Sequence, residues 1–153
     1  MRRLVFTNLL LAFVIPLANA QGVASDEVVT ALKAHFESAH PEDRPDLGMR
    51  IAREQLRNAD KLYGEGNADQ GHAAVDDVVT YSEKARDAAI LSRKHLKNVE
   101  IDVRKMAEKL RDIERTLAFD DQAPVEQAIR RLEDVRTTLL KEMFAKDKKK
   151  ETK

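Results

Sequence analysis

Residues 75–117 read VDDVVTYSEKARDAAILSRKHLKNVEIDVRKMAEKLRDIERTL, and the spacing of their apolar side chains decides the fold. Steps of three and four residues alternate without a slip, as in helices that pack side by side. Eleven of the thirteen positions in this register are apolar, against seven of the other thirty. We name these thirteen positions the seam: Val75, Val78, Ser82, Ala85, Ala89, Ser92, Leu96, Val99, Val103, Met106, Leu110, Ile113 and Leu117. The seam predicts one packed helical face.

A single long helix is expected to carry the seam. Neither glycine nor proline occurs between Gly71 and Pro124, so the pattern predicts an unbroken helix from about Asp69 to Leu117. At 1.5 Å per residue this helix would span about 73 Å. Its first half carries small seam residues and its second half bulky ones, which indicates two different packing partners.

Shorter helices are expected on both sides of this long one. The first is capped by Ser25, and prolines in residues 40–46 end it. The second runs from about Asp46 to the glycines of residues 64–67, and the fourth begins at Pro124. Because short loops favour antiparallel neighbours, the second and fourth helices should fold back onto the two halves of the long helix. The expected fold is therefore all-α: a long central helix with shorter antiparallel helices packed along it, as an extended helical hairpin or coiled-coil-like bundle.

Two uses of the seam remain open at this point. It can form the core of one chain, or it can also drive homodimerisation through the helices. Ser82 and Ser92, its polar members, are weak specifiers of either state.

The turn after the second helix resembles the mid-repeat turn of a tetratricopeptide unit. Small and aromatic residues carry the resemblance, in which a small residue lets two helices approach: Ala59, Leu62, Tyr63, Gly66 and Ala73. No period near 34 residues recurs along the chain. The resemblance therefore implies a helical hairpin and not a repeat array.

The N-terminus has the features of a secretory signal peptide. Arg2 and Arg3 precede an apolar run from Leu4 to Ile15, and an A-x-A site ends at Ala20. Cleavage there predicts an exported protein, periplasmic or, alternatively, extracellular, without a transmembrane span. We expect one helical domain over residues 21–145 and a disordered Lys-rich tail over residues 146–153.

Composition narrows the class of partner. The chain has no cysteine, so it carries no disulfide framework and no lipid attachment site. Residues 21–153 hold 25 Lys and Arg against 27 Asp and Glu, a net charge of about −2. A nucleic-acid partner is not expected, since neutralising phosphates requires a basic excess.

Ligand-binding spacings are sparse. Asp69, His72 and Asp76 share one helix face and form a partial metal site, which one helix cannot complete. A haem held by His95 with Met49 or Met106 is a further hypothesis without a selecting motif. We predict no cofactor.

No catalytic constellation is expected either. The serines lie in predicted helices or caps, away from any nucleophile elbow, and the carboxylates are spread as surface charge. The chain is accordingly not predicted to be an enzyme.

The leading hypothesis is a structural or interaction protein of the cell envelope that presents an elongated helical surface to a protein partner. Ile90, Leu91 and Ile101 are apolar but off the seam, so they are the candidate partner-binding residues. The alternatives are a periplasmic chaperone-like binder of unfolded chains and a metal- or haem-binding bundle. The Lys-rich tail adds a possible weak contact with anionic envelope surfaces.

Overall fold

Five helices make up the described part of the chain. The computed structural model describes the backbone of residues 20–150 and the side chains of residues 26–145. The helices are α1 (Ala20–Ser38), α2 (Arg44–Gly64), α3 (Ala68–Ser92), α4 (Leu96–Glu114) and α5 (Phe119–Lys150). The predicted all-α class is confirmed, with helices packed against one another. The predicted signal peptide lies outside the described residues except for Ala20.

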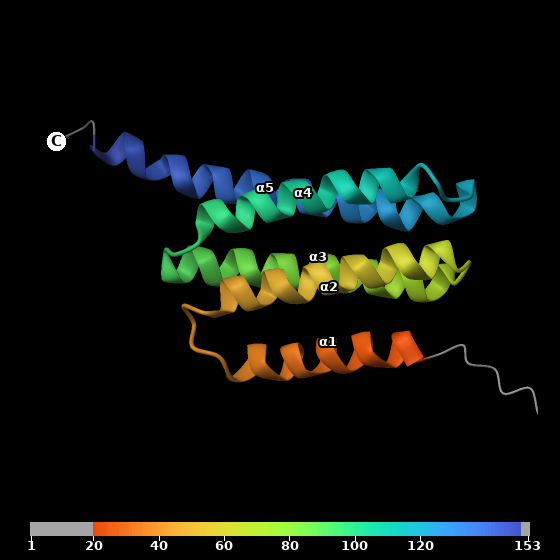
Figure 1. Cartoon of the computed structure of the whole chain (residues 1–153). Coiled ribbons are helices and arrows are strands. Elements are labelled where there is room, and N and C mark those ends of the chain that lie inside the picture. Colours follow the sequence, from red (N-terminus) through yellow and green to blue (C-terminus); the bar gives the residue numbers. More distant parts are fainter. Residues whose placement is uncertain (1–19, 151–153) are drawn as a thin grey trace, which may run out of the picture.

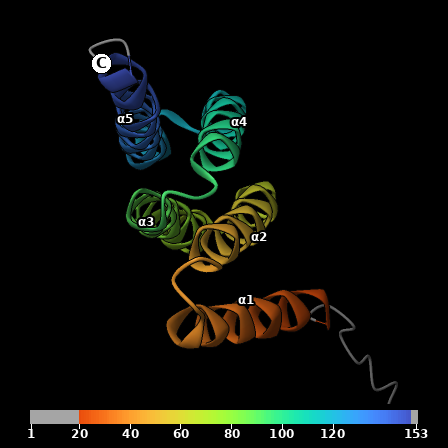
Figure 2. The ribbon, with the colours of Figure 1, turned by 90° about the vertical axis from the view of Figure 1, so that its left-hand side faces the viewer.

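The helices form a bundle of two stacked hairpins with one additional helix. Figure 1 shows α2 and α3 as one antiparallel pair and α4 and α5 as a second pair above it. In the end-on view of Figure 2, α3 lies below α5, α2 lies below α4, and α1 crosses obliquely beneath the first pair. The predicted antiparallel pairing of the second and fourth helices with the two halves of the seam is therefore found.

Ion pairs show how α2 and α4 are aligned. Arg53 pairs with Asp102 at 2.6 Å, and Asp60 pairs with Lys109 at 2.7 Å. The two ion pairs are seven residues apart on α2, from 53 to 60, and seven residues apart on α4, from 102 to 109. The two helices therefore run parallel and in register.

The predicted long helix is wrong in one respect, because it is two helices. Arg93 and His95 both adopt left-handed backbone conformations, with φ of 57° and 63°. They end α3 and begin α4, so the chain reverses between Ser92 and Leu96. Left-handed backbone is strained for residues other than glycine, so neither residue type signalled a turn. Packing of α4 against α2 and α5 outweighs that local strain.

Most seam residues are buried although the chain reverses between Ser92 and Leu96. Ten of its positions are buried, and only Ser92, Leu96 and Leu117 are half-buried. The Ser82 hydroxyl donates a 2.7 Å hydrogen bond to the Val78 carbonyl, which satisfies the buried polar member. The buried apolar seam residues of α3 and α4 belong to one hydrophobic cluster, so the seam faces one intramolecular core from both helices.

Gly48 brings α2 close to α3. A Cβ at this position would lie 2.9 Å from Ala85 Cβ and 3.0 Å from the Tyr81 carbonyl oxygen. Near the other end of the pair, the Tyr63 ring packs directly on Gly71. The hairpin implied by the turn resemblance is present, with glycines at the close approaches.

Helix α1 docks on the outside of the first hairpin. Its buried residues are Val29, Leu32 and Phe36. The Phe36 ring meets Tyr81 edge to face, with 5.6 Å between ring centroids. Lys33 adds a 2.6 Å ion pair with Asp77. Helix α1 therefore buries its apolar side against the first hairpin, and an ion pair stabilises the edge of this contact.

Several helix ends differ from their predicted positions. Helix α1 begins at Ala20, so Ser25 lies inside it and does not cap it. Helix α5 begins at Phe119 and contains Pro124, because Asp120 and Asp121 favour an earlier first turn. Residues 118–123, between the predicted end of the long helix at Leu117 and the predicted start of the last helix at Pro124, are thus largely helical. The first five residues of the predicted tail lie in the last turns of α5.

Candidate interaction surface

The three predicted partner-binding residues differ in exposure. Leu91, the last residue but one of α3, is 80% exposed. Ile90 and Ile101 are half-buried. Leu91 is therefore the candidate among them that offers a partner most of its surface.

The residues of the hypothetical metal site are not brought together. His72 points its Nε2 at the Asp121 carbonyl oxygen, 3.2 Å away, and its ring packs edge-on against Tyr63. Asp69 and Asp76 are exposed. Over the part of the chain that the structure describes, no group of three or more His, Cys, Asp or Glu side chains assembles as a metal site.

The residues considered for haem lie in different surroundings. His95 is at the α3–α4 turn, where its Nδ1 lies 3.1 Å from the Asp46 carboxylate. Met49 and Met106 are buried in the core, with 2% and 3% exposure. The imidazole and the two thioethers are thus already engaged in structural contacts.

Charged residues also bridge the two loops at this end of the bundle. Lys94 Nζ lies 2.5 Å from a carboxylate oxygen of Glu42, between the α3–α4 turn and the α1–α2 loop. The hydrogen bond from Lys94, and then its positive charge, lower the pKa of Glu42 below the ordinary value. The pair is exposed, so it joins the loops while remaining in solvent.

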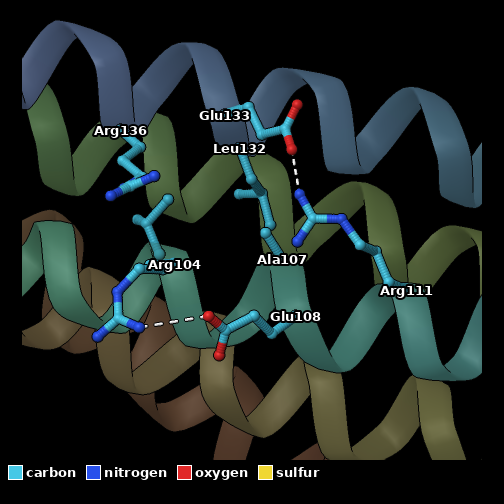
Figure 3. A pocket seen from close by; sticks show the side chains of 8 residues that line it. Arg104, Ala107, Glu108, Arg111, Leu132, Glu133 and Arg136 are labelled. Atoms are coloured by element: carbon cyan, nitrogen blue, oxygen red, sulfur yellow. Dashed lines mark hydrogen bonds and ion pairs between the residues drawn. The ribbon is translucent and has the colours of Figure 1, made fainter.

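A shallow groove follows the outer side of the α4–α5 hairpin. Figure 3 shows its charged rim, where Arg104 pairs with Glu108 at 3.3 Å and Arg111 pairs with Glu133. Its apolar lining comes from Val103, Ala107 and Leu132. Because these two arginines already have carboxylate partners, an anion binding there would compete with existing ion pairs.

The position of α5 along α3 is fixed by a two-point contact. Arg131 donates to both carboxylate oxygens of Glu83, at 3.1 and 2.9 Å. The two helices run in the same direction (Figure 1). Ser92, the last residue of α3, is nine residues beyond Glu83, so α3 ends level with about residue 140 of α5.

The antiparallel helix α4 gives the same limit. Arg136 donates to Glu100 at 2.7 Å. Leu96, the first residue of α4, lies four residues before Glu100. Because α4 and α5 are antiparallel, Leu96 is level with the residue about four positions beyond Arg136, which is Leu140. Two independent contacts therefore place the end of the bundle at the same level of α5.

Helix α5 runs on past this level. Residues 141–150 form an overhang of about 15 Å at 1.5 Å per residue. Figure 1 shows this C-terminal end of α5 extending past the ends of α3 and α4. We name residues 141–150 the α5 overhang.

The core-facing side of α5 continues into the overhang as far as Met143. Leu139 is completely buried, Met143 is half-buried and Phe144 is 63% exposed. Met143 follows Leu139 by about one helical turn, whereas Phe144 lies about 100° around the helix from Met143, in line with the exposed residues Glu133 and Thr137. Phe144 is therefore an exposed aromatic side chain on the outer side of α5, and Leu91 is exposed at the same end of the bundle.

The apolar pattern of the last helix does not by itself single out Phe144 as an exposed residue. Its sequence carries two adjacent i, i+4 apolar pairs, Leu139 with Met143 and Leu140 with Phe144. Nothing in such a pattern shows which pair faces the core or where neighbouring helices end. A signal was nevertheless present, because the lysines that follow Phe144 mark the approach to solvent.

Comparison of the chain with protein-family models, with curated proteins and with solved structures gives no match. None of the described helices combines the length and apolar character needed to cross a bilayer.

Proposed function

We propose that this chain is an exported, non-enzymatic interaction protein of the cell envelope, and that it contacts its partner with the α5 overhang. The observation that carries the proposal is the exposure of Phe144 on a helix that extends past its own bundle. Aromatic side chains such as phenylalanine are enriched in the cores of protein interfaces. Export is supported by the signal-peptide pattern of residues 1–20.

The rigidity of its support favours the overhang over other exposed apolar residues. Helix α5 is anchored by Val125, Leu132, Val135 and Leu139, all with 0% exposure. A helix continued from such an anchor presents its side chains with little loss of conformational freedom on binding. The overhang is in this sense a preorganised surface.

Site-specific photocrosslinking in cells of the native host tests the proposal. A photoreactive phenylalanine analogue replaces Phe144 in one variant and Phe119 in another. Phe119 is 86% exposed at the opposite end of the same helix, which makes it a matched control. We expect adducts at position 144, few at position 119, and an N-terminus at Gln21 in the crosslinked species.

Two results would contradict this proposal. Equal crosslinking at both positions would show that exposure alone, and not the overhang, determines contact. A crosslinked chain that still begins at Met1 in the cytosolic fraction would contradict export.

A chaperone-like binder of unfolded chains is the second candidate. The observation that favours it is the presence of two exposed apolar side chains, Leu91 and Phe144, at one end of the bundle. On this hypothesis, the stoichiometric protein slows the aggregation of several unrelated denatured clients, and Phe144→Ser abolishes the effect. Failure to slow any of them would eliminate it.

A further inference from the structure

The charge of the overhang differs from that of the rest of the chain. Residues 141–150 contain five lysines, one glutamate and one aspartate, a net charge of +3. The whole chain has a net charge of zero, so the remaining residues carry −3. Positive charge is therefore concentrated on the segment that also carries the half-buried Met143 and the exposed Phe144.

A second copy of this chain is a poor occupant for the overhang. Pairing two overhangs through Phe144 would bring two segments, each with a net charge of +3, into contact. Their positive charges would repel each other. Pairing an overhang with the groove of Figure 3 offers its lysines no free carboxylate, because Glu108 and Glu133 are already paired with Arg104 and Arg111. The charge pattern thus favours a partner that is anionic and offers an apolar layer.

An anionic bilayer surface has both properties. Helices that lie at such a surface place apolar side chains at the boundary of headgroups and acyl chains, and lysines near the lipid phosphates. The bundle leaves the overhang free on the side where α3 and α4 have ended, so it can approach a flat surface without unpacking.

We propose that the α5 overhang binds the surface of a bilayer that contains anionic phospholipid, with Met143 and Phe144 in the headgroup boundary and the lysines against lipid phosphates. This inference rests on the proposed function, because it specifies the partner of the same surface. One short apolar contact and a few lysines give reversible binding that depends on ionic strength.

Tryptophan fluorescence of the full chain tests the inference directly. The chain contains no tryptophan, so Phe144→Trp introduces a single local probe, and Phe119→Trp is the matched control. Each is mixed with vesicles of phosphatidylglycerol and phosphatidylcholine, or of phosphatidylcholine alone. Lipids brominated on their acyl chains quench only a probe that reaches the boundary region.

We expect the emission of Phe144→Trp to shift to the blue and to be quenched on anionic vesicles only, with reversal at high salt. Phe119→Trp should show neither change. Replacing Lys148, Lys149 and Lys150 by glutamine in the Phe144→Trp chain should weaken binding at least about tenfold. Residues 1–20 are common to all of these chains, so differences between them report on α5.

Each other outcome has a distinct meaning. Equal shifts on neutral and anionic vesicles would overturn the role of charge and thereby the inference. A shift that depends on protein concentration without vesicles would identify a second copy as the occupant. No shift with vesicles, but protein adducts at position 144 in cells, would overturn the lipid partner and leave the proposed function standing; loss of both would overturn both.

Discussion

At the scale of single residues, Gly48 sets the closest approach of α2 and α3. A methyl group there would meet the Ala85 side chain and the Tyr81 carbonyl, neither of which can move without its backbone. We expect Gly48→Ala to lower the free energy of unfolding by about 1–2 kcal/mol, since overpacking exceeds the gain of about 1 kcal/mol in helix propensity. Urea unfolding measures the change.

Gly64→Ala is the matched control for this substitution. Gly64 ends α2, and a Cβ there meets nothing within 4 Å. The free energy of unfolding of the Gly64→Ala variant should be unchanged or slightly raised. A stabilised Gly48→Ala variant would contradict the close helix packing.

Tyr63 carries a hydroxyl that is buried without a hydrogen-bond partner. Burial raises its pKa well above the ordinary value of 10.0, and the nearby carboxylates of Asp121 and Asp76 add to this rise. We expect Tyr63→Phe to raise the free energy of unfolding by up to about 1 kcal/mol at neutral pH, because the unsatisfied group is removed while the ring remains.

The same residue predicts a pH dependence. Folded Tyr63 holds its proton more tightly than the unfolded chain does, so its contribution to stability is present below pH 10 and is lost as pH rises above that value. The stability advantage of Tyr63→Phe should therefore grow above pH 10. Thermal melts of both proteins between pH 8 and pH 11 measure this, and a constant difference would contradict the raised pKa.

At the scale of elements, the α3–α4 turn decides how the seam is used. Arg93 has φ of 57°, a conformation that glycine adopts without strain. We expect Arg93→Gly to raise the free energy of unfolding by about 1 kcal/mol. A continuous helix through this position would instead lose about 1 kcal/mol, so the sign of the change distinguishes the two arrangements.

Lys105→Gly provides the comparison in the middle of α4. Lys105 is exposed within that helix, so glycine there should lower the stability by about 1 kcal/mol. Denaturant titrations of both variants measure the opposite signs. An equal loss of stability in both variants would indicate a single long helix and would contradict the α3–α4 turn.

At the scale of the whole molecule, the turn converts a rod into a bundle. The absence of cysteine from the chain permits selective spin labelling at Asp69→Cys and Asp112→Cys, two exposed positions. A continuous helix would separate these positions by about 65 Å, whereas the reversal returns α4 to the end of the bundle where α3 begins. We expect a distance below about 30 Å by pulsed electron resonance, since neighbouring helix axes are about 10 Å apart.

The sequence alone determined the all-α class, the seam and the antiparallel packing of the second and fourth helices on its two halves, because apolar periodicity reports which helix face is buried. Val99, Val103 and Leu110 are at 0% exposure as the register requires. Only the tertiary structure decided that the chain reverses at Arg93 and His95, since packing overrides the local preference of those residue types. It also decided how far α5 extends past its neighbours. A helix carries its apolar stripe in its own sequence, but where the cover ends depends on the lengths and offsets of its neighbours.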